Sequence, residues 1–153
     1  MSDTPFSQRV MDDLKDAMKA KDATALTVLR ALKSAIKYAA IEKHGADGDL
    51  DETDALAVVR KQIKQRQDSI ESYEKAGRDD LADTEKAEMA VLEKYLPAAM
   101  SEADVVALVE QCIAEVGAES KKEMGQVMKL LQEKAAGRAD NKVLSQEVMK
   151  RLS

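Results

Sequence analysis

Residues 51–97 read DETDALAVVRKQIKQRQDSIESYEKAGRDDLADTEKAEMAVLEKYLP, with a turn signal at Ala76-Gly77-Arg78. Apolar residues recur every three or four positions on both sides of that turn: Leu56, Val59, Ile63, Ile70 and Tyr73 before it, and Leu81, Met89, Leu92 and Tyr95 after it. This spacing aligns side chains along one stripe of an α-helix. We therefore predict a long antiparallel helical hairpin. Its first helix is capped by Asp51 and its second ends at Tyr95-Leu96-Pro97, because proline cannot continue a helix.

Each apolar stripe of the hairpin is interrupted by charge, at Arg66 in the first helix and at Glu88 in the second. Facing positions of an antiparallel hairpin have a nearly constant sum of residue numbers. Tyr73 opposite Leu81 gives 154, and Arg66 opposite Glu88 also gives 154. We predict a partly buried structural ion pair between Arg66 and Glu88 that fixes the register. The alternative is that both side chains lie at the edge of the stripe and reach solvent.

The rest of the chain also has helical periodicity, with few windows that alternate with period two. Two helices precede the hairpin, one from about Ser7 and one from the Asp22 cap to about Lys43. Three shorter helices follow it, opened by Ser101, Ser120 and Asp140, with Gly117 and Gly137 ending the first two. The expected fold is all-α: an N-terminal helical domain with the long hairpin at residues 1–97, followed by a small three-helix C-terminal domain at residues 98–153.

The composition excludes several classes of function. With a single cysteine, Cys112, the chain has no internal disulfide and no cysteine-rich metal site. The only histidine, His44, is far from Cys112 in sequence, and neither phosphate-loop pattern occurs. The acidic loop at 44–49 does not match calcium-ligand spacing. We expect no catalytic residues, no metal and no cofactor.

The chain shows no membrane or export signal. No run approaches the ~18 apolar residues that a membrane span needs. The N-terminus lacks a basic region followed by an apolar run, as a secretory signal would have. From these absences we predict a cytoplasmic protein without a membrane partner.

The charge is unevenly distributed along the chain. The formal net charge is −5, but residues 119–153 hold eight basic and five acidic side chains, which leaves this tail at +3. A basic tail on an acidic body favours a polyanion partner, although scattered lysines also serve solubility.

Two sets of basic residues are candidates for RNA binding. The first lies in the tail: Lys121, Lys122, Lys129, Arg138 and Lys142. The second lies on the first hairpin helix, away from its apolar stripe: Arg60, Lys61 and Lys64. Lys121 and Lys122 fall in a first helical turn, where free backbone N–H groups also favour a phosphate. No aromatic residue accompanies either set, so we expect contact with the backbone of a folded RNA and no base stacking.

Several ordered motifs resemble the YqeY family (GatB/YqeY). They are residues 60–70 (RKQIKQRQDSI), residues 76–81 (AGRDDL), Tyr95-Leu96-Pro97, residues 120–125 with Val127-Met128, and residues 137–140 (GRAD). They cover almost the whole chain at the right distances. One departure is Asn141, where the family pattern often has glycine.

The resemblance implies a relation to the C-terminal region of the B subunit of the tRNA-dependent amidotransferase. It implies a helical N-terminal part, a three-helix tail and a role in tRNA recognition without chemistry of its own. Two alternatives stay open. One is a protein–protein adaptor. The other is an in-trans component of a carbon–nitrogen ligase that uses glutamine as amido donor.

Overall fold

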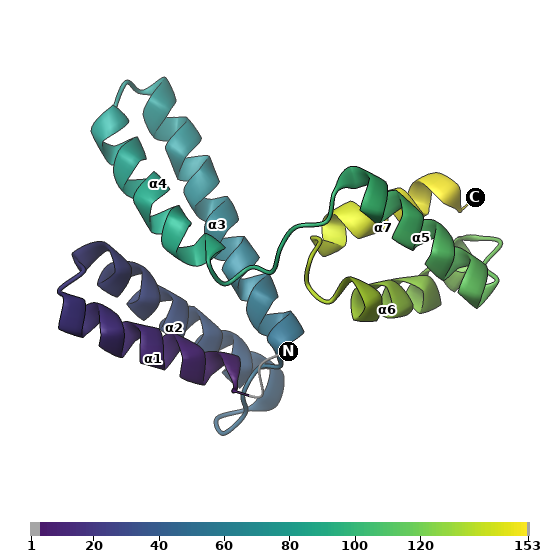
Figure 1. The fold of residues 1–153 in the computed structure, drawn as a ribbon, viewed down its shortest axis with the longest axis horizontal. Coiled ribbons are helices and arrows are strands. Elements are labelled where there is room, and N and C mark those ends of the chain that lie inside the picture. Colours follow the sequence, from purple (N-terminus) through teal and green to yellow (C-terminus); the bar gives the residue numbers. More distant parts are fainter. Residues whose placement is uncertain (1–3, 153) are drawn as a thin grey trace. The chain divides into compact units, whose positions relative to one another are not determined.

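The computed structural model describes residues 4–152, and every regular element within them is a helix. The all-α prediction is therefore confirmed. The elements are α1 (Phe6–Ala20), α2 (Ala23–His44), α3 (Glu52–Lys75), α4 (Asp79–Glu93), α5 (Glu102–Val116), the 3₁₀-helix η1 (Lys121–Glu123), α6 (Met124–Ala135) and α7 (Asn141–Arg151). The chain divides into two compact units, Met1–Tyr95 (unit 1) and Leu96–Ser153 (unit 2), which Figure 1 shows with α1–α4 in the first and α5–α7 in the second.

Polar side chains begin most of the helices, as the sequence predicts. The carboxylate of Asp22 accepts a hydrogen bond from the Ala25 N–H (3.1 Å), and that of Asp51 accepts one from the Asp54 N–H (2.8 Å). In unit 2, Ser101 Oγ accepts from the Asp104 N–H at 3.1 Å. Each bond satisfies a backbone donor that has no partner within the first turn of its helix, which fixes where the helix starts.

Helices α3 and α4 form the predicted antiparallel hairpin (Figure 1). The turn between them passes through Gly77, whose φ of +71° suits a residue without a Cβ. Helix α4 ends at Glu93, before the Tyr95-Leu96-Pro97 stretch where the end was predicted. The Tyr95 N–H instead closes a turn on the Leu92 carbonyl at 3.1 Å.

Only half of the hairpin stripe is buried. Helices α1 and α2 lie side by side and pack against the end of the hairpin farthest from its turn, where Val59 and Leu92 are completely buried. Toward the turn, Ile70, Tyr73 and Leu81 are half-buried, because no further helix of unit 1 covers them. Periodicity identified the stripe, but it could not indicate how far the neighbouring helices extend.

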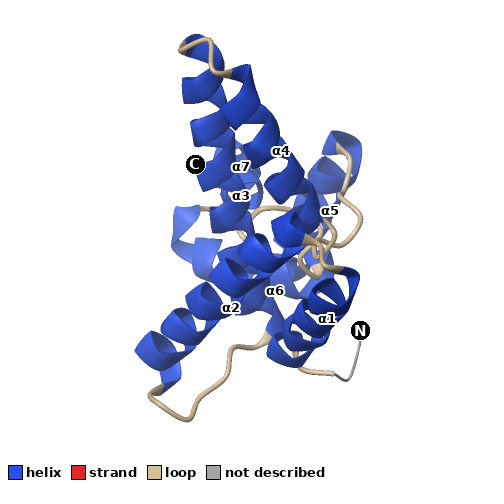
Figure 2. Ribbon diagram, turned by 90° about the vertical axis from the view of Figure 1, so that its left-hand side faces the viewer, coloured by secondary structure: helices blue, strands red, loops and turns tan. Residues whose placement is uncertain are grey.

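Polar and aromatic contacts tie α1 to the rest of unit 1. Ser7 Oγ donates to a carboxylate oxygen of Asp49 (2.8 Å), in the long loop between α2 and α3 that Figure 2 shows. Arg9 pairs with Glu52 and stacks over the Phe6 ring at 4.7 Å. The same ring lies 5.4 Å from that of Tyr95. These contacts hold α1 against the start of α3 and against Tyr95, which follows α4.

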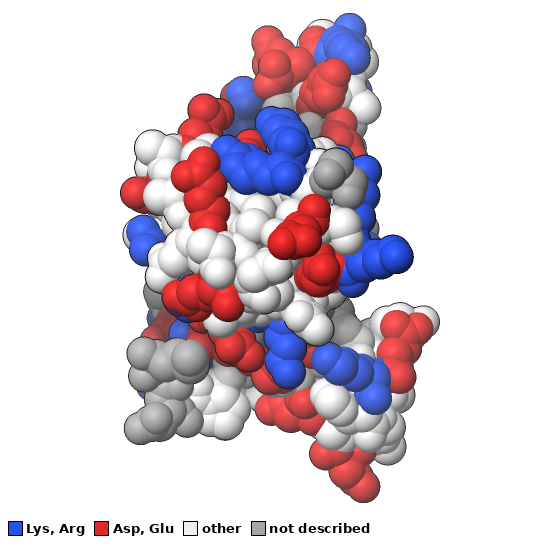
Figure 3. All heavy atoms as spheres, turned by 90° about the vertical axis from the view of Figure 1, so that its right-hand side faces the viewer, with Lys and Arg blue, Asp and Glu red and all other residues white. Residues whose placement is uncertain are grey.

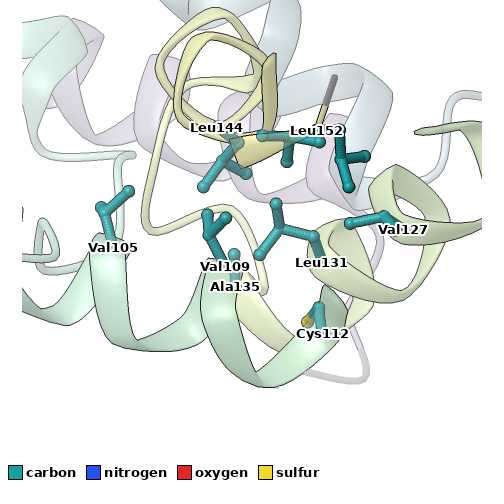
Figure 4. Packing of buried hydrophobic residues seen from close by; sticks show 9 residues of the cluster. Val105, Val109, Cys112, Val127, Leu131, Ala135, Leu144 and Leu152 are labelled. Atoms are coloured by element: carbon teal, nitrogen blue, oxygen red, sulfur yellow. The ribbon is translucent and has the colours of Figure 1, made fainter. Parts of the chain in front are cut away.

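Unit 2 has its own core, which Figure 4 shows as apolar side chains from α5, α6 and α7 pointing toward one another. Nine buried residues make up this core: Val105, Val109, Cys112, Val127, Leu131, Ala135, Leu144, Val148 and Leu152. Leu131 and Leu144 are the largest of those that are completely buried. The three predicted helices thus pack on one small cluster, although Val143 and Met149 of α7 remain exposed.

Candidate nucleic-acid interface

The two residues most often used in nucleophilic catalysis lie in settings unsuited to it. Cys112 is completely buried in the core of unit 2, and this burial raises the pKa of its thiol, so the reactive thiolate is disfavoured. His44 is exposed at the end of α2. Within residues 4–152, no group of three or more His, Cys, Asp or Glu side chains could hold a metal ion.

Lys121 and Lys122 lie in η1, directly ahead of α6, and both are exposed. The predicted capping box is present here. Ser120 Oγ accepts from the Lys122 N–H (3.3 Å), and Glu123 Oε2 accepts from the N–H groups of Ser120 (2.9 Å) and Glu119 (3.0 Å). Because the Glu123 carboxylate already occupies this helix start, the lysine side chains, rather than the backbone N–H groups, are available to a phosphate.

The other three tail candidates differ in whether their side chains form contacts within unit 2. Arg138 is bound to its own unit, since its Nε donates to the Ala98 carbonyl at 3.0 Å and its carbonyl accepts from the Met100 N–H at 3.1 Å. Lys129 on α6 and Lys142 in the first turn of α7 are exposed, and neither forms an ion pair within the described residues. Arg138 therefore holds the segment before α5 in place, whereas the lysines extend into solvent.

The remaining basic side chains of unit 2 are paired with acids. Lys134 Nζ lies 2.7 Å from Glu115, and Arg151 lies 2.7 Å from Glu147. Lys150 also contacts Glu147, at 3.1 Å. Among the described residues of the tail, four exposed lysines thus have no acidic partner: Lys121, Lys122, Lys129 and Lys142. We call these four the tail lysines.

The candidates on the hairpin form a weaker positive surface. Lys61 and Lys64 are exposed on α3, and Arg60 is half-buried. Asp68 follows Lys64 by one turn, and Glu71 pairs with Lys75 at 2.9 Å on the same helix. Acids so close to the lysines reduce the attraction for a polyanion. Figure 3, which looks at the side of the molecule that lies at the right in Figure 1, shows basic and acidic side chains interspersed over the face in view.

Arg66 and Glu88 lie together between the hairpin helices. Arg66 Nε is 3.4 Å from Glu88 Oε2, and the two side chains are only 12% and 15% exposed. The same guanidinium donates to Gln62 Oε1 at 3.0 Å, while its buried Nε has no hydrogen-bond acceptor in the described structure. The pair is therefore a charge contact without an aligned hydrogen bond. That it sets the register of the hairpin stays a prediction.

One basic set was missed at the sequence level. Arg30, Lys33 and Lys37 are all exposed on α2, and Tyr38, 67% exposed, lies next to them. These residues lie on the side of α2 that the rest of unit 1 leaves uncovered. The absence of any acid between Asp22 and Glu42 was the signal that could have identified the uncovered side.

Unit 1 also has two hollows on its surface. One, of about 260 Å³, is lined mainly by α1 and α2, with Val10, Met11 and Ile36 among its walls. The other, of about 360 Å³, lies beside Tyr95 and is lined by the acids Asp13, Asp16 and Asp22. Asp13 accepts a hydrogen bond from the Tyr95 hydroxyl, and burial together with this bond raises the pKa of Tyr95. These three acids outnumber Lys94, the one basic residue named in its lining, so the hollow disfavours a nucleic acid.

The described residues form two compact helical units, and comparison with known proteins identifies the family. Residues 7–152 match the family described as Yqey-like protein, and the chain belongs to the YqeY family. The resemblance found in the sequence is thereby confirmed.

The similar curated proteins carry the name "Altered inheritance of mitochondria protein 41, mitochondrial". The one from Lachancea thermotolerans is 41% identical over 107 residues, which cover 68% of this chain and 56% of that protein. The one from Eremothecium gossypii is 40% identical over 86 residues, 56% of this chain and 46% of that protein. The one from Pyrenophora tritici-repentis is 31% identical over 144 residues, 92% and 77% respectively. The chain spans about half the length of the first two of these relatives.

These findings and the structure bear on the predictions about cellular location and about the membrane. The prediction of a cytoplasmic protein is wrong, because the relatives are named mitochondrial proteins. The lack of a secretory signal carried no information about that organelle. None of the described helices combines the length and the apolar composition needed to cross a bilayer.

Proposed function

We propose that this chain is a tRNA-binding accessory protein that performs no chemistry of its own. The observation that carries the proposal is the set of four tail lysines, exposed and without acidic partners in the described structure, on a tail with a net charge of +3. Lysines held in this way can approach phosphates without first breaking an ion pair. Backbone contact of this kind suits a folded RNA, which proteins recognise largely by shape and phosphate position.

The sequence resemblance implies a relation to the B subunit of the tRNA-dependent amidotransferase, and this implied relation supports tRNA as the ligand. Because the relatives are named for mitochondria, we propose that the chain works with tRNA in that compartment. Subcellular fractionation of cells that express the natural gene tests the location separately from the binding.

Fluorescence anisotropy of labelled tRNA across a salt series tests the binding. If all four tail lysines contact phosphates, the logarithm of the association constant should fall with the logarithm of salt concentration with a slope of about −3 to −4. The double charge reversal Lys121→Glu/Lys122→Glu should weaken binding and make the slope shallower by about 2. No binding of tRNA at low salt would refute the proposal.

Two further variants show which basic set is used. Lys61→Glu/Lys64→Glu makes the same change of charge on α3 and should leave most of the affinity intact. Lys134→Glu reverses a lysine that is already paired with Glu115, so it should affect the slope less than reversal of a tail lysine. An equal loss in all of these variants would indicate a nonspecific effect of net charge and would count against the tail lysines as the site.

A further inference from the structure

Helix α2 has one buried and one uncovered side. Val28, Leu29, Leu32, Ile36 and Ala40 are buried against the rest of unit 1. On the other side, Arg30, Lys33 and Lys37 follow one another at intervals of three and four residues, and all three are exposed. At 100° per residue, Arg30, Lys37, Tyr38 and Ile41 fall within an arc of about 100° and Lys33 lies about 40° beyond it. We call these five residues the α2 face.

The α2 face is positive although unit 1 as a whole is acidic. Unit 1 contains 16 basic and 20 acidic residues, a net charge of −4. Helix α2 contains four Lys or Arg against the single Glu42, a net charge of +3. Within the described residues, Arg30, Lys33 and Lys37 form no ion pair with an acid. A local positive surface on an acidic body attracts a polyanion to that place in particular.

Tyr38 gives this face a second property that the other basic sets lack. Its side chain is 67% exposed, and the neighbouring Ile41 is 44% exposed. The ring of Tyr95, by contrast, packs on Phe6 and its hydroxyl bonds Asp13. Within the described structure, Tyr38 forms neither a contact with another aromatic ring nor a side-chain hydrogen bond. An accessible aromatic ring beside cations is the arrangement on which bases of single-stranded nucleic acids stack.

We propose that the α2 face binds an unpaired segment of RNA, with a base stacked on Tyr38 and phosphates on Arg30, Lys33 and Lys37. The cations span about 10 Å along the helix, at 1.5 Å per residue, which is the length of a few nucleotides. The proposal shares RNA as ligand with the proposed function, but it concerns another unit, another surface and unpaired rather than folded RNA. Charge alone would also attract an acidic protein, so stacking on Tyr38 is the feature that the test must isolate.

The chain contains no tryptophan, which makes a direct test of stacking possible. The variant Tyr38→Trp places the only indole of the protein on the α2 face. Addition of a short oligouridylate at low salt should quench its emission, because a base that stacks on the ring quenches it. Inorganic polyphosphate, which has charge but no bases, should compete for the cations without quenching the emission itself.

Binding of labelled oligouridylate by ring and charge variants then separates stacking from attraction. Tyr38→Ala should weaken binding by about tenfold, within the range known for loss of one stacked base. Tyr38→Phe keeps the ring and should bind as the wild type does. Lys33→Glu/Lys37→Glu should weaken binding strongly, whereas Lys15→Glu/Lys19→Glu, an equal change on exposed residues of α1, should not. Far-UV circular dichroism verifies that each variant is folded.

The results distinguish this proposal from the function proposed above. Weakened oligouridylate binding in Tyr38→Ala together with unchanged binding in Lys121→Glu/Lys122→Glu would support the α2 face as a separate site. Loss of tRNA binding in the tail variant, with oligouridylate binding unaffected by Tyr38→Ala, would overturn the α2 face and leave the proposed function standing. Equal affinity of Tyr38→Ala and wild type, with loss only on charge reversal, would mean attraction without stacking and would also overturn it.

Discussion

Arg66 and Glu88 carry charge into a hairpin that is otherwise held together by apolar contacts. Both side chains are largely buried, and the Arg66 Nε lacks a hydrogen-bond acceptor in the described structure. Desolvation of two charges is expensive, so such a pair adds little net stability over apolar residues of similar size. The pair matters when only one partner is replaced, because the charge of the remaining partner is then buried without an opposite charge.

We therefore expect Arg66→Met and Glu88→Leu each to destabilise unit 1 by about 2–3 kcal/mol, somewhat below the ~3–5 kcal/mol of a fully buried pair. The double variant should be much closer to the wild type than the sum of the two losses. Urea unfolding of the four proteins measures this coupling. The exposed pair Glu71–Lys75 on the same helix is the control and should show no resolvable coupling. Additive losses at Arg66 and Glu88 would exclude a role in the register.

Glu123 makes unit 2 sensitive to acid. Hydrogen bonds from the backbone N–H groups of Ser120 and Glu119 hold the pKa of its carboxyl below the ordinary value of 4.5. A lowered pKa in the folded state means that the stabilisation is complete above pH 4.5 and is lost as the pH falls through the folded-state value. We expect Glu123→Gln to flatten this part of the pH dependence of the unfolding free energy. Glu133→Gln, on the exposed side of α6, should not change it.

The Glu123→Gln substitution should remove only part of the pH dependence of the unfolding free energy. Lys134 lowers the pKa of Glu115, and Arg151 lowers that of Glu147, so these two carboxyls keep their own dependence on pH in the Glu123 variant. Urea unfolding followed by circular dichroism at a series of acidic pH values measures the difference. Identical pH profiles for Glu123→Gln and the wild type would contradict the role assigned to the capping box.

Two glycines of unit 2, one just after the end of α5 and one in the first turn of α6, should respond oppositely to substitution by alanine. Gly117 ends α5 with a left-handed φ of +72°, whereas Gly125 lies within α6. Neither position has an atom within 4 Å of an added Cβ, so space does not distinguish them. We expect Gly117→Ala to destabilise unit 2 by about 1 kcal/mol and Gly125→Ala to stabilise it by about 0.5–1 kcal/mol. Thermal unfolding of both variants measures the signs, and equal signs would contradict this reasoning.

The starts of helices were where sequence reasoning succeeded best. Asp22, Asp51, Ser101 and the Ser120–Glu123 box are local signals, since each donor and acceptor lies within four residues of the other. The extent of burial was harder to predict because it depends on distant segments. Ile70 and Tyr73 continue the stripe of α3, but α1 and α2 do not reach them. The α2 face was also missed, although Arg30, Lys33 and Lys37, with no acid between Asp22 and Glu42, were a local sign of an uncovered side.

For the candidate RNA-binding residues, the sequence predicted which side chains are charged. It could not predict which of these side chains remain without contacts inside the protein. Arg138 and Lys142 look alike in the sequence, yet Arg138 donates to the Ala98 carbonyl, 40 residues away. The pairing of Lys134 with Glu115 likewise joins α6 to α5. Contacts between helices decide which cations stay free, and these contacts follow only from the packed unit.

The division into two units has a consequence that spectroscopy can test. All three tyrosines, Tyr38, Tyr73 and Tyr95, lie in unit 1, and the chain has no tryptophan, so tyrosine fluorescence reports on unit 1 alone. Leu32 in unit 1 and Leu131 in unit 2 are both completely buried. Truncation of either leucine to alanine should cost about 2–5 kcal/mol in the unit that contains it.

If the two cores are independent, Leu131→Ala should shift the urea transition seen by circular dichroism to lower concentration and leave the tyrosine transition unchanged. Leu32→Ala should shift the tyrosine transition, because the lost contacts lie in the unit that the probe reports on. A tyrosine transition displaced equally by both variants would mean that one cooperative unit spans the chain. Independent unfolding would also mean that a change in the tail lysines leaves the α2 face intact, so the two proposed RNA sites could be altered one at a time.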